Sequence, residues 1–315
     1  MKPIHGFAPS SLKVKIPLLL AELRAPFLTA SLASVFLGTA MAWVSWKNID
    51  PIFLLLTLAG TFCLHSSANV INDYFDYKSG CDGLNRDSIP PFTGGSGLLV
   101  SGALRPNEVL ALASSLFLTA GAIGLYLAMI RGWIILVLVA VAVLSGYFYT
   151  THLATRGVGE LVVGLCFGPL LAFGTYYVQT NSFALGPLLA GLPLGLLVAA
   201  ILWINEIPDY RADSLVGKNT AVVRLGKRRA AQVYVCIVGL AYAIIGFGIL
   251  ARVLPVTSAL TFLSLPLALK AARIANTSYD SKELRPANGL TISTHLVVGI
   301  LLTTGYILLP LLPAI

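Results

Sequence analysis

Long apolar segments alternate with short polar ones along the whole chain. A helix that crosses a bilayer needs about 20 predominantly apolar residues, and the breaks between such segments here carry charged residues, Pro or Gly. This pattern predicts nine transmembrane helices, at Pro26–Trp46, Pro51–Tyr74, Asn107–Met129, Trp133–Tyr149, Glu160–Gln179, Leu185–Ile207, Ala230–Leu250, Pro255–Ala275 and Leu290–Leu309. A shorter segment, Val14–Leu23, is predicted to form a helix at the membrane interface.

Composition agrees with this membrane pattern. Of the 315 residues, 57% are hydrophobic and 11% are charged, which leaves too little polar surface to cover a soluble globule. We therefore predict an all-α polytopic membrane protein, with nine transmembrane helices in a single bundle and one membrane-embedded domain over residues 1–315. Two connections on one face, about 77–106 and 209–229, are long, and we expect them to be cap loops over a functional site.

The formal net charge of +8 is unevenly distributed. If the N-terminus lies inside the cell, all but three of the 21 Lys and Arg fall on the cytoplasmic side, the exceptions being Lys47, Arg131 and Arg252. This positive-inside pattern predicts a multi-pass protein of the cell membrane whose N-terminus and cap loops are cytoplasmic. A basic inner face suits anionic membrane lipids, so we expect no nucleic-acid partner, and we infer no obligate protein partner.

Two predicted spans end in the same polar pattern, N-[D/E]-x-x-D. It reads NDYFD at 72–76 and NEIPD at 205–209. An ionised Asp at mid-bilayer costs about 3 kcal/mol, so neither cluster is expected to face lipid. Two helices of the same direction with matching polar ends predict a pseudo-repeated bundle with one shared site between them.

The residue types in these clusters indicate a hard divalent cation. More than half of the 13 acidic residues lie in or beside the two clusters, and carboxylates so crowded repel one another unless a cation neutralises them. Oxygen donors without Cys or His at ligand spacing favour Mg²⁺ over zinc. Asn72 with Asp76, and Asp209 with Asp213, each stand four residues apart, so we predict two Mg²⁺ half-sites that a diphosphate bridges.

Basic residues near both clusters are candidates to hold a diphosphate. They are Lys78, Arg156, Arg211 and Lys218. Each of them could instead bind lipid headgroups. Lys218 is the best placed, because it directly follows the second cluster.

These motifs resemble the UbiA superfamily of membrane prenyltransferases, over nearly the whole chain. The family's first motif has an Asn-Asp-x-x-Asp core, matched at 72–76, and a later Asp, matched by Asp82 two residues beyond the commonest spacing. Together with the segments 94–106, 159–179 and 217–226, that spacing is similar to the menaquinone branch, the 1,4-dihydroxy-2-naphthoate polyprenyltransferases.

The resemblance implies Mg²⁺-dependent transfer of an isoprenyl chain from a polyprenyl diphosphate to an aromatic acceptor, here 1,4-dihydroxy-2-naphthoate. It implies metal and diphosphate ligation by Asn72, Asp76, Asp209 and Asp213 and further functional acids at Asp73 and Asp82, and it matches Lys218 to a basic residue of the second loop. We accordingly expect the five Asp residues at 73, 76, 82, 209 and 213 to act in catalysis.

Four residues are candidates to contact the acceptor or a carbocation: Arg24, Tyr147, Tyr149 and Asn205. Tyr149 falls near a family tyrosine close to the reacting carbon. Arg24 falls near a family Arg that precedes a Pro, although Ala25 intervenes here. A tyrosine ring stabilises a nearby cation through its π-face, which suits Tyr147 and Tyr149.

Two alternatives stay open. Glu206 and Pro208 depart from the naphthoate branch, so the acceptor could instead be a hydroxybenzoate, homogentisate, a glyceryl lipid or a tetrapyrrole. A cation-coupled secondary transporter is the alternative of another class. It predicts carboxylates near mid-bilayer and discontinuous helices in both halves. Here the clusters lie at helix ends and lead into long loops, which favours an enzyme.

Overall fold

The computed structural model describes residues 12–311, and within that range it contains helices and no strand. Nine helical segments there are long and apolar enough to cross a membrane: Ala25–Trp46, Pro51–Ser79, Pro106–Arg131, Trp133–Arg156, Gly159–Thr180, Leu185–Leu215, Lys227–Leu250, Val256–Ser278 and Lys282–Leu311. The predicted all-α membrane bundle is therefore confirmed. The predicted position of the N-terminus concerns residues 1–11, which lie outside the described residues.

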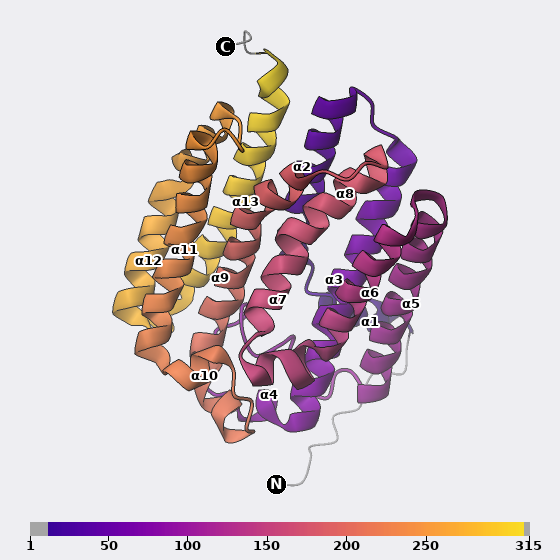
Figure 1. Ribbon diagram of the computed structural model, residues 1–315. Coiled ribbons are helices and arrows are strands. Elements are labelled where there is room, and N and C mark those ends of the chain that lie inside the picture. Colours follow the sequence, from indigo (N-terminus) through magenta and orange to yellow (C-terminus); the bar gives the residue numbers. More distant parts are fainter. Residues whose placement is uncertain (1–11, 312–315) are drawn as a thin grey trace.

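Most helices follow one another with short connections, and the longest connection, residues 85–105, joins α4 to α5 (Figure 1). They are α1 (Leu12–Glu22), α2 (Thr29–Trp46), α3 (Pro51–Ser79), α4 (Cys81–Leu84), α5 (Pro106–Arg131), α6 (Trp133–Phe148), α7 (Gly159–Leu165), α8 (Leu171–Thr180), α9 (Leu185–Leu215), α10 (Ala221–Leu225), α11 (Lys227–Leu250), α12 (Leu265–Ser278) and α13 (Arg285–Leu308). A π-helical segment, Cys166–Leu170, joins α7 to α8 in one span.

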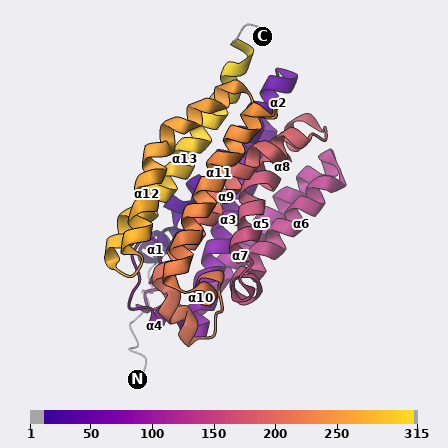
Figure 2. The same ribbon diagram turned by 60° about the vertical axis from the view of Figure 1, so that its left-hand side comes forward.

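The arrangement places α9 between two groups of helices. Figures 1 and 2 show α11, α12 and α13 on one side of α9, and α3, α5 and α6 on the other. Leu194, Leu197 and Ile204 of α9 are fully buried, in a core that they share with Tyr234 of α11 and Val298 of α13. The short helices α4 and α10 lie together at one end of the bundle, where α3 and α9 end (Figure 1).

The ends of α3 carry clear stop and start signals. Asp50 precedes the helix, and its side chain accepts hydrogen bonds from the backbone N–H of Ile52 and Phe53, while Pro51 occupies the first turn. Gly80, at φ +81°, ends the helix in the left-handed conformation that favours glycine. The segment predicted at 14–23 forms α1.

Two of the membrane-spanning helices are longer than the apolar segments in the sequence predicted. α3 continues to Ser79 and α9 continues through Pro208 to Leu215, so Asp76 and Asp213 lie on helices. The connections predicted at 77–106 and 209–229 consequently begin later, and each contains a short helix, α4 or α10. Both extensions carry polar residues, which hydropathy alone assigns to a loop.

Glycines let α9 approach the α7–α8 span at backbone distance. A Cβ on Gly168 would lie 2.3 Å from the backbone nitrogen of Gly195, and one on Gly195 would lie 2.4 Å from the carbonyl oxygen of Gly164. Small residues at the interface allow this approach in membrane bundles, where van der Waals packing drives helix association. The contact fixes the distance between the helices that carry Glu160 and Glu206.

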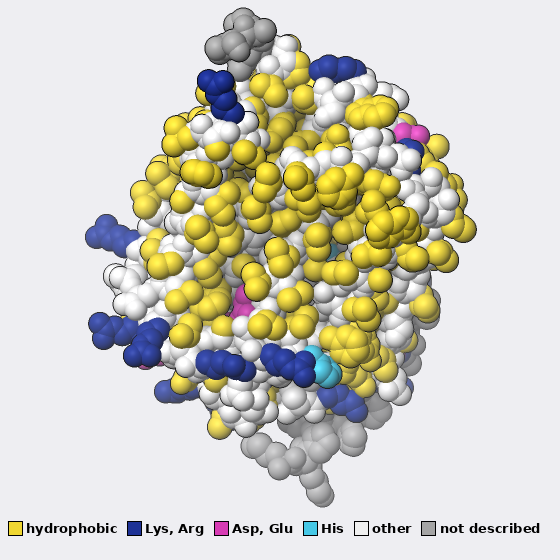
Figure 3. Space-filling view, in the orientation of Figure 1, with side chains coloured by type: hydrophobic (Ala, Val, Ile, Leu, Met, Phe, Trp, Pro, Cys, Tyr) yellow, Lys and Arg dark blue, Asp and Glu magenta, His cyan; other side chains and the backbone are white. Residues whose placement is uncertain are grey.

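The outer surface matches a bilayer setting. Figure 3 shows apolar side chains covering the middle of the visible face, while most of the Lys and Arg side chains in view lie toward the end that carries α4 and α10. Large apolar residues such as Leu118, Leu250 and Leu263 are among the most exposed. The nine spans and this surface identify a multi-pass membrane protein.

The glycine contact predicts a position-dependent effect of one methyl group. We expect Gly168→Ala to lower the free energy of unfolding by about 1–3 kcal/mol, because its Cβ meets backbone rather than a flexible side chain. Gly121 of α5 is a matched control, since nothing lies within 4 Å of a Cβ built there. Gly121→Ala should leave stability unchanged or raise it by up to about 1 kcal/mol. Unfolding midpoints in detergent distinguish the two, and equal midpoints would contradict the close contact.

Candidate active site

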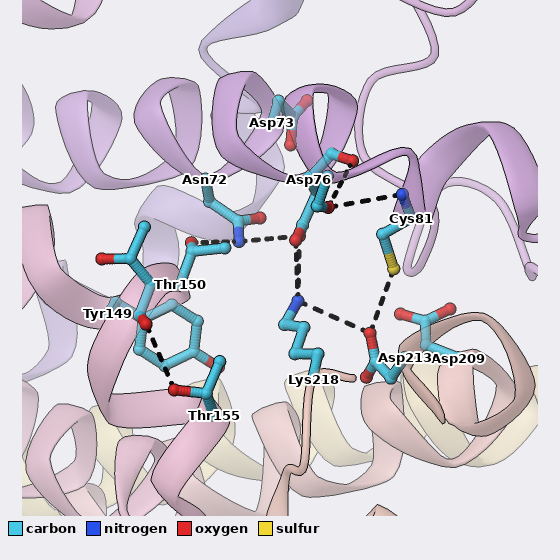
Figure 4. A network of polar contacts seen from close by, with 12 residues as sticks. Asn72, Asp73, Asp76, Cys81, Tyr149, Thr150, Thr155, Asp209, Asp213 and Lys218 are labelled. Carbon is cyan, nitrogen blue, oxygen red and sulfur yellow. Dashed lines mark hydrogen bonds and ion pairs between the residues drawn. The ribbon is translucent and has the colours of Figure 1, made fainter. Parts of the chain in front are cut away.

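A lysine joins the two acidic clusters. The ammonium nitrogen of Lys218 lies 2.9 and 3.0 Å from the two carboxylate oxygens of Asp76 on α3, and 3.6 Å from Oδ1 of Asp213 on α9 (Figure 4). The side chains of all three residues are at most 12% exposed. The structure thus brings the ends of α3 and α9, 137 residues apart at these positions, to one site.

Neighbouring polar groups hold these carboxylates in place. Asn72 donates from Nδ2 to Asp76 at 3.0 Å and to the hydroxyl of Thr150 at 2.8 Å. The Cys81 thiol donates to Oδ1 of Asp213 at 3.2 Å. Figure 4 shows these residues converging around Lys218 from three parts of the chain.

Asp209 lies beside this network on α9. Its Oδ1 accepts a hydrogen bond of 2.6 Å from Nδ2 of Asn85, which follows α4. The other polar atom of that amide, Oδ1 of Asn85, is buried and has no hydrogen-bond partner within residues 12–311. An oxygen left in this state next to a carboxylate is a ready ligand for a cation.

Charge and burial set the protonation of the loop residues. Burial disfavours the charge of Lys218, but Asp76 and Asp213 outweigh it and raise the lysine pKa well above its ordinary value, so the ammonium stays charged. Burial, with help from Asp76 and Asp73, raises the pKa of Asp82 to about 7. Burial and the charge of Asp213 raise the pKa of the Cys81 thiol, which therefore remains protonated.

The network lines one end of a cavity of about 320 Å³. Beyond the acids, the cavity is lined mainly by apolar residues of α3, α5, α6 and α8, as far as Leu56 on α3, with a few polar side chains such as Thr57 and His65 among them. Asp76 and Leu56 are separated by about 30 Å of helix, at 1.5 Å per residue. Three buried side chains, Leu127, Ile135 and Val178, line the far part. The cavity is therefore charged at one end and mainly apolar along the rest.

Most of the predicted site residues line this cavity. They are Arg24, Asn72, Asp76, Asp82, Tyr149, Asn205, Asp209, Asp213 and Lys218. They come from helices and loops spread over most of the chain, yet they meet at its polar end.

Asp73 has a different environment from Asp76, although both belong to one motif. Asp73 is 2% exposed and does not line the cavity. Its carboxylate accepts the backbone N–H of Ser96 at 2.6 Å and lies 3.4 Å from Nη1 of Arg24. A Cβ on Gly95, at φ +63°, would lie 3.0 Å from oxygens of both Asp73 and Asp82. Asp73 therefore holds Arg24 and the loop at 94–96 against α3.

Four further predicted residues lie away from the cavity. Lys78 is exposed, with its ammonium 5.8 Å from the ring of Tyr74. Tyr147 is 43% exposed and packs edge-on against neighbouring aromatic rings. Arg156 is exposed, and Arg211 is exposed and 3.7 Å from Asp87. Side chains two residues apart on a helix point to different faces. Lys78 therefore points away from Asp76, and Tyr147 points away from Tyr149.

Sequence reasoning missed several residues of the site. Asn85, Cys81 and Thr150 hold the acids, and no pattern in the sequence marked them as partners. Glu22 is fully buried at the end of α1 and accepts a hydrogen bond from Ser96. Burial, with Asp73 nearby, raises the pKa of Glu22 to about 7. The only hint in the sequence that Glu22 belongs to the site was its position two residues before Arg24.

The oxygen donors at this site suit Mg²⁺, which does not need a site built entirely from protein ligands. Within residues 12–311, no three His, Cys, Asp or Glu side chains form a group that could hold a metal ion by themselves. Mg²⁺ is usually bound by one or two carboxylates and completes its shell with phosphate and water. Asn72 with Asp76, and Asp209 with Asp213, supply oxygen donors of this kind on facing helices.

Known proteins are similar to this chain in sequence and in fold. The sequence profile of the UbiA prenyltransferase family matches residues 31–308. The chain is 30% identical over 309 residues to a 2-carboxy-1,4-naphthoquinone phytyltransferase from Synechocystis, covering 95% of this chain and 96% of the relative. It is 27% identical over 285 residues to a 1,4-dihydroxy-2-naphthoate octaprenyltransferase from Bacillus subtilis, covering 89% of each.

Solved structures resemble the bundle at low sequence identity. A UbiA homolog from Aeropyrum pernix has a TM-score of 0.68 at 19% identity, and the match covers 91% of this chain and 98% of that one. A UbiA homolog from Archaeoglobus fulgidus bound to DMAPP and Mg²⁺ has a TM-score of 0.60 at 15% identity, covering 91% and 99%. At these identities the likeness concerns the fold.

The contacts of Asp73 predict a local effect on the loop at 94–98. We expect Asp73→Ala to speed amide hydrogen exchange at Ser96 about tenfold or more, because a hydrogen bond to a charged group contributes about 1.5–3 kcal/mol. Asp280→Ala, at an exposed ion pair with Lys227, is the control and should leave that segment unchanged. Unchanged exchange at Ser96 in Asp73→Ala would show that the carboxylate does not hold the loop.

Proposed function

The chain belongs to the UbiA prenyltransferase family, and we propose that it transfers the chain of a polyprenyl diphosphate to 1,4-dihydroxy-2-naphthoate, as in menaquinone biosynthesis. It is a membrane prenyltransferase, and two relatives named for naphthoquinone and naphthoate acceptors support that acceptor. We treat residues 1–315 as one membrane-embedded domain in the cell membrane. The charge pattern supports a cytoplasmic position for its N-terminus and for the polar site, with the regions 77–106 and 209–229 as its cap.

The observation that carries the proposal is the division of one cavity into a charged end and a long apolar part. A polyprenyl diphosphate has the same two parts. Its charged head suits the end formed by Asp76, Asp209, Asp213 and Lys218, and its hydrocarbon tail suits the apolar walls that reach Leu56. The same walls keep water from the reacting carbon.

We propose that two Mg²⁺ ions bind the head, one at Asn72 and Asp76 and one at Asp209 and Asp213. Ions held there would supply positive charge to the leaving diphosphate. Mg²⁺ in the Archaeoglobus fulgidus homolog supports the choice of ion. Lys218, already between the two acidic helices, adds a fixed positive charge at the same end.

The reaction then needs two bond changes at carbon. The allylic C–O bond breaks and its electron pair leaves with the diphosphate. The ring carbon that bears the carboxylate forms the new C–C bond, and CO₂ leaves while its bonding pair returns to the ring. Tyr149 lines the cavity beside the acids, where its ring can stabilise the allylic cation. Arg24, tethered by Asp73, lines the same end and suits the carboxylate of the acceptor.

The transporter alternative fits less well. α9 runs without a break from Leu185 to Leu215 through Pro193 and Pro208, whereas transporter sites are typically built from discontinuous helices. The acids lie where α3 and α9 end, and their loops fold over them.

Removing a proposed metal ligand should stop the reaction. We expect Asp76→Asn and Asp209→Asn to lower prenyl transfer at least about 10²-fold, because each change removes a charge that holds the diphosphate through Mg²⁺. EDTA should cause the same loss in the unaltered protein, and added Mg²⁺ should restore activity. Asp280→Asn, at an exposed residue that does not line the cavity, is the control. Near-normal turnover in either variant would contradict the two-metal proposal.

The acceptor is tested directly by product mass. We expect purified protein with a polyprenyl diphosphate and Mg²⁺ to prenylate 1,4-dihydroxy-2-naphthoate and release CO₂, and to act more slowly on hydroxybenzoate and homogentisate. Liquid chromatography with mass detection identifies each product. Reaction with another acceptor while dihydroxynaphthoate stays unchanged would overturn the acceptor assignment and keep the reaction class.

A further inference from the structure

Two buried glutamates lie beside the cavity and take no part in the mechanism described above. Glu160, in the first turn of α7, is 3% exposed, and Glu206 of α9 is 9% exposed. Their side chains contact each other, and Oε1 of Glu206 accepts the Tyr149 hydroxyl at 3.4 Å. In the part of the chain that the structure describes, no Lys or Arg forms an ion pair with either one.

One oxygen of each glutamate has no hydrogen-bond partner. These atoms are Oε1 of Glu160 and Oε2 of Glu206, both buried within the described residues. A buried polar atom left without a partner costs about 1–3 kcal/mol. Each of these carboxyl groups therefore retains capacity to take part in another hydrogen bond.

The position of the pair is fixed by the fold. α7 and α9 meet at backbone distance through Gly164 and Gly195, so Glu160 faces Glu206 with little freedom to move away. Glu206, unlike Glu160, lines the cavity. The geometry therefore presents one carboxyl group to the ligand and places the second behind it.

Glu206 lies at the level along the axis of α9 where the acceptor ring is expected to bind. It precedes Asp209 by three residues, about 4.5 Å along the helix axis. Asp209 belongs to the charged end proposed for the diphosphate, and the cavity residues before Glu206 on α9 turn apolar at Leu202 and Ile201. The first carbon of the prenyl chain lies next to its diphosphate, so a ring that attacks this carbon comes within reach of Glu206.

We propose that Glu206 accepts a hydrogen bond from a ring hydroxyl of the acceptor and takes its proton as the new C–C bond forms. The O–H bonding pair stays on the ring oxygen, which makes the attacking carbon more electron-rich. After CO₂ leaves, the proton returns from the carboxyl group to the ring oxygen, which yields the hydroquinone product. Glu160 and Tyr149 are positioning residues that act through Glu206. This inference rests on the proposed function and extends it to hydroxylated aromatic acceptors as a class.

The test compares two acceptors in two proteins. Glu206→Gln keeps the shape of the side chain and an oxygen for Tyr149, but cannot take the proton. With dihydroxynaphthoate we expect this variant to lower kcat/KM about 10²–10⁴-fold while the KM for the prenyl diphosphate stays unchanged. With the methyl ether of the reacting hydroxyl, both proteins should act equally slowly. Glu206→Asp should recover part of the lost activity.

Further variants and controls keep the outcome decisive. Glu160→Gln should lower kcat/KM for the free hydroxyl less than Glu206→Gln does, and exposed Glu283→Gln should change nothing. Unfolding midpoints in detergent show whether each variant is folded. A folded Glu206→Gln with unchanged kcat/KM, or with the same loss on hydroxyl and methyl ether, overturns the inference. If the unaltered protein prenylates no hydroxylated aromatic ring, the proposed function itself fails, before any variant is compared.

Discussion

The charge balance between α3 and α9 is the constraint on which the site depends. Asp76 and Asp213 come from helices distant in sequence and would repel each other in this buried setting, and the ammonium of Lys218 between them removes that repulsion. Loss of one partner from a buried ion pair typically costs about 3–5 kcal/mol, because the other charge is left uncompensated. The hydrogen bond from Cys81 to Asp213, which joins the same two parts of the chain, depends on this spacing.

The two aspartates of the first motif, Asp73 and Asp76, lie on different faces of α3 and have different partners. Asp76 points toward Lys218 and the cavity. Asp73, three residues earlier, does not line the cavity and instead holds Arg24 and the Ser96 amide. A carboxylate that faces a substrate must keep coordination capacity, while one that holds a loop uses that capacity in fixed hydrogen bonds. One short motif thus supplies a ligand group and the support for an acceptor-side arginine.

The sequence predicted the spans well, because a bilayer imposes a minimum apolar length on each helix. It predicted the partners of the clusters less well. The four-residue spacing of Asn72 and Asp76 correctly indicated that both lie on one helix face. The closeness of Lys78 to the motif in sequence did not reveal that its side chain is exposed and points away from the cavity. Glu160 could not have been found, since its role depends on the contact between α7 and α9 that the glycines allow.

The proline in the second cluster, at 205–209, has a structural consequence. Pro208 lacks an N–H, so the carbonyl of Ile204, four residues earlier, loses its helical hydrogen bond. Asn288 of α13 replaces it, donating to that carbonyl at 3.3 Å and to Oδ1 of Asn205 at 2.7 Å. The Asn288 amide therefore satisfies the carbonyl that the proline leaves without a partner, and it also orients the side chain of Asn205, which lines the cavity. Because Glu206 lies in the same turn, the proline and its repair also fix the backbone that presents the proposed proton acceptor.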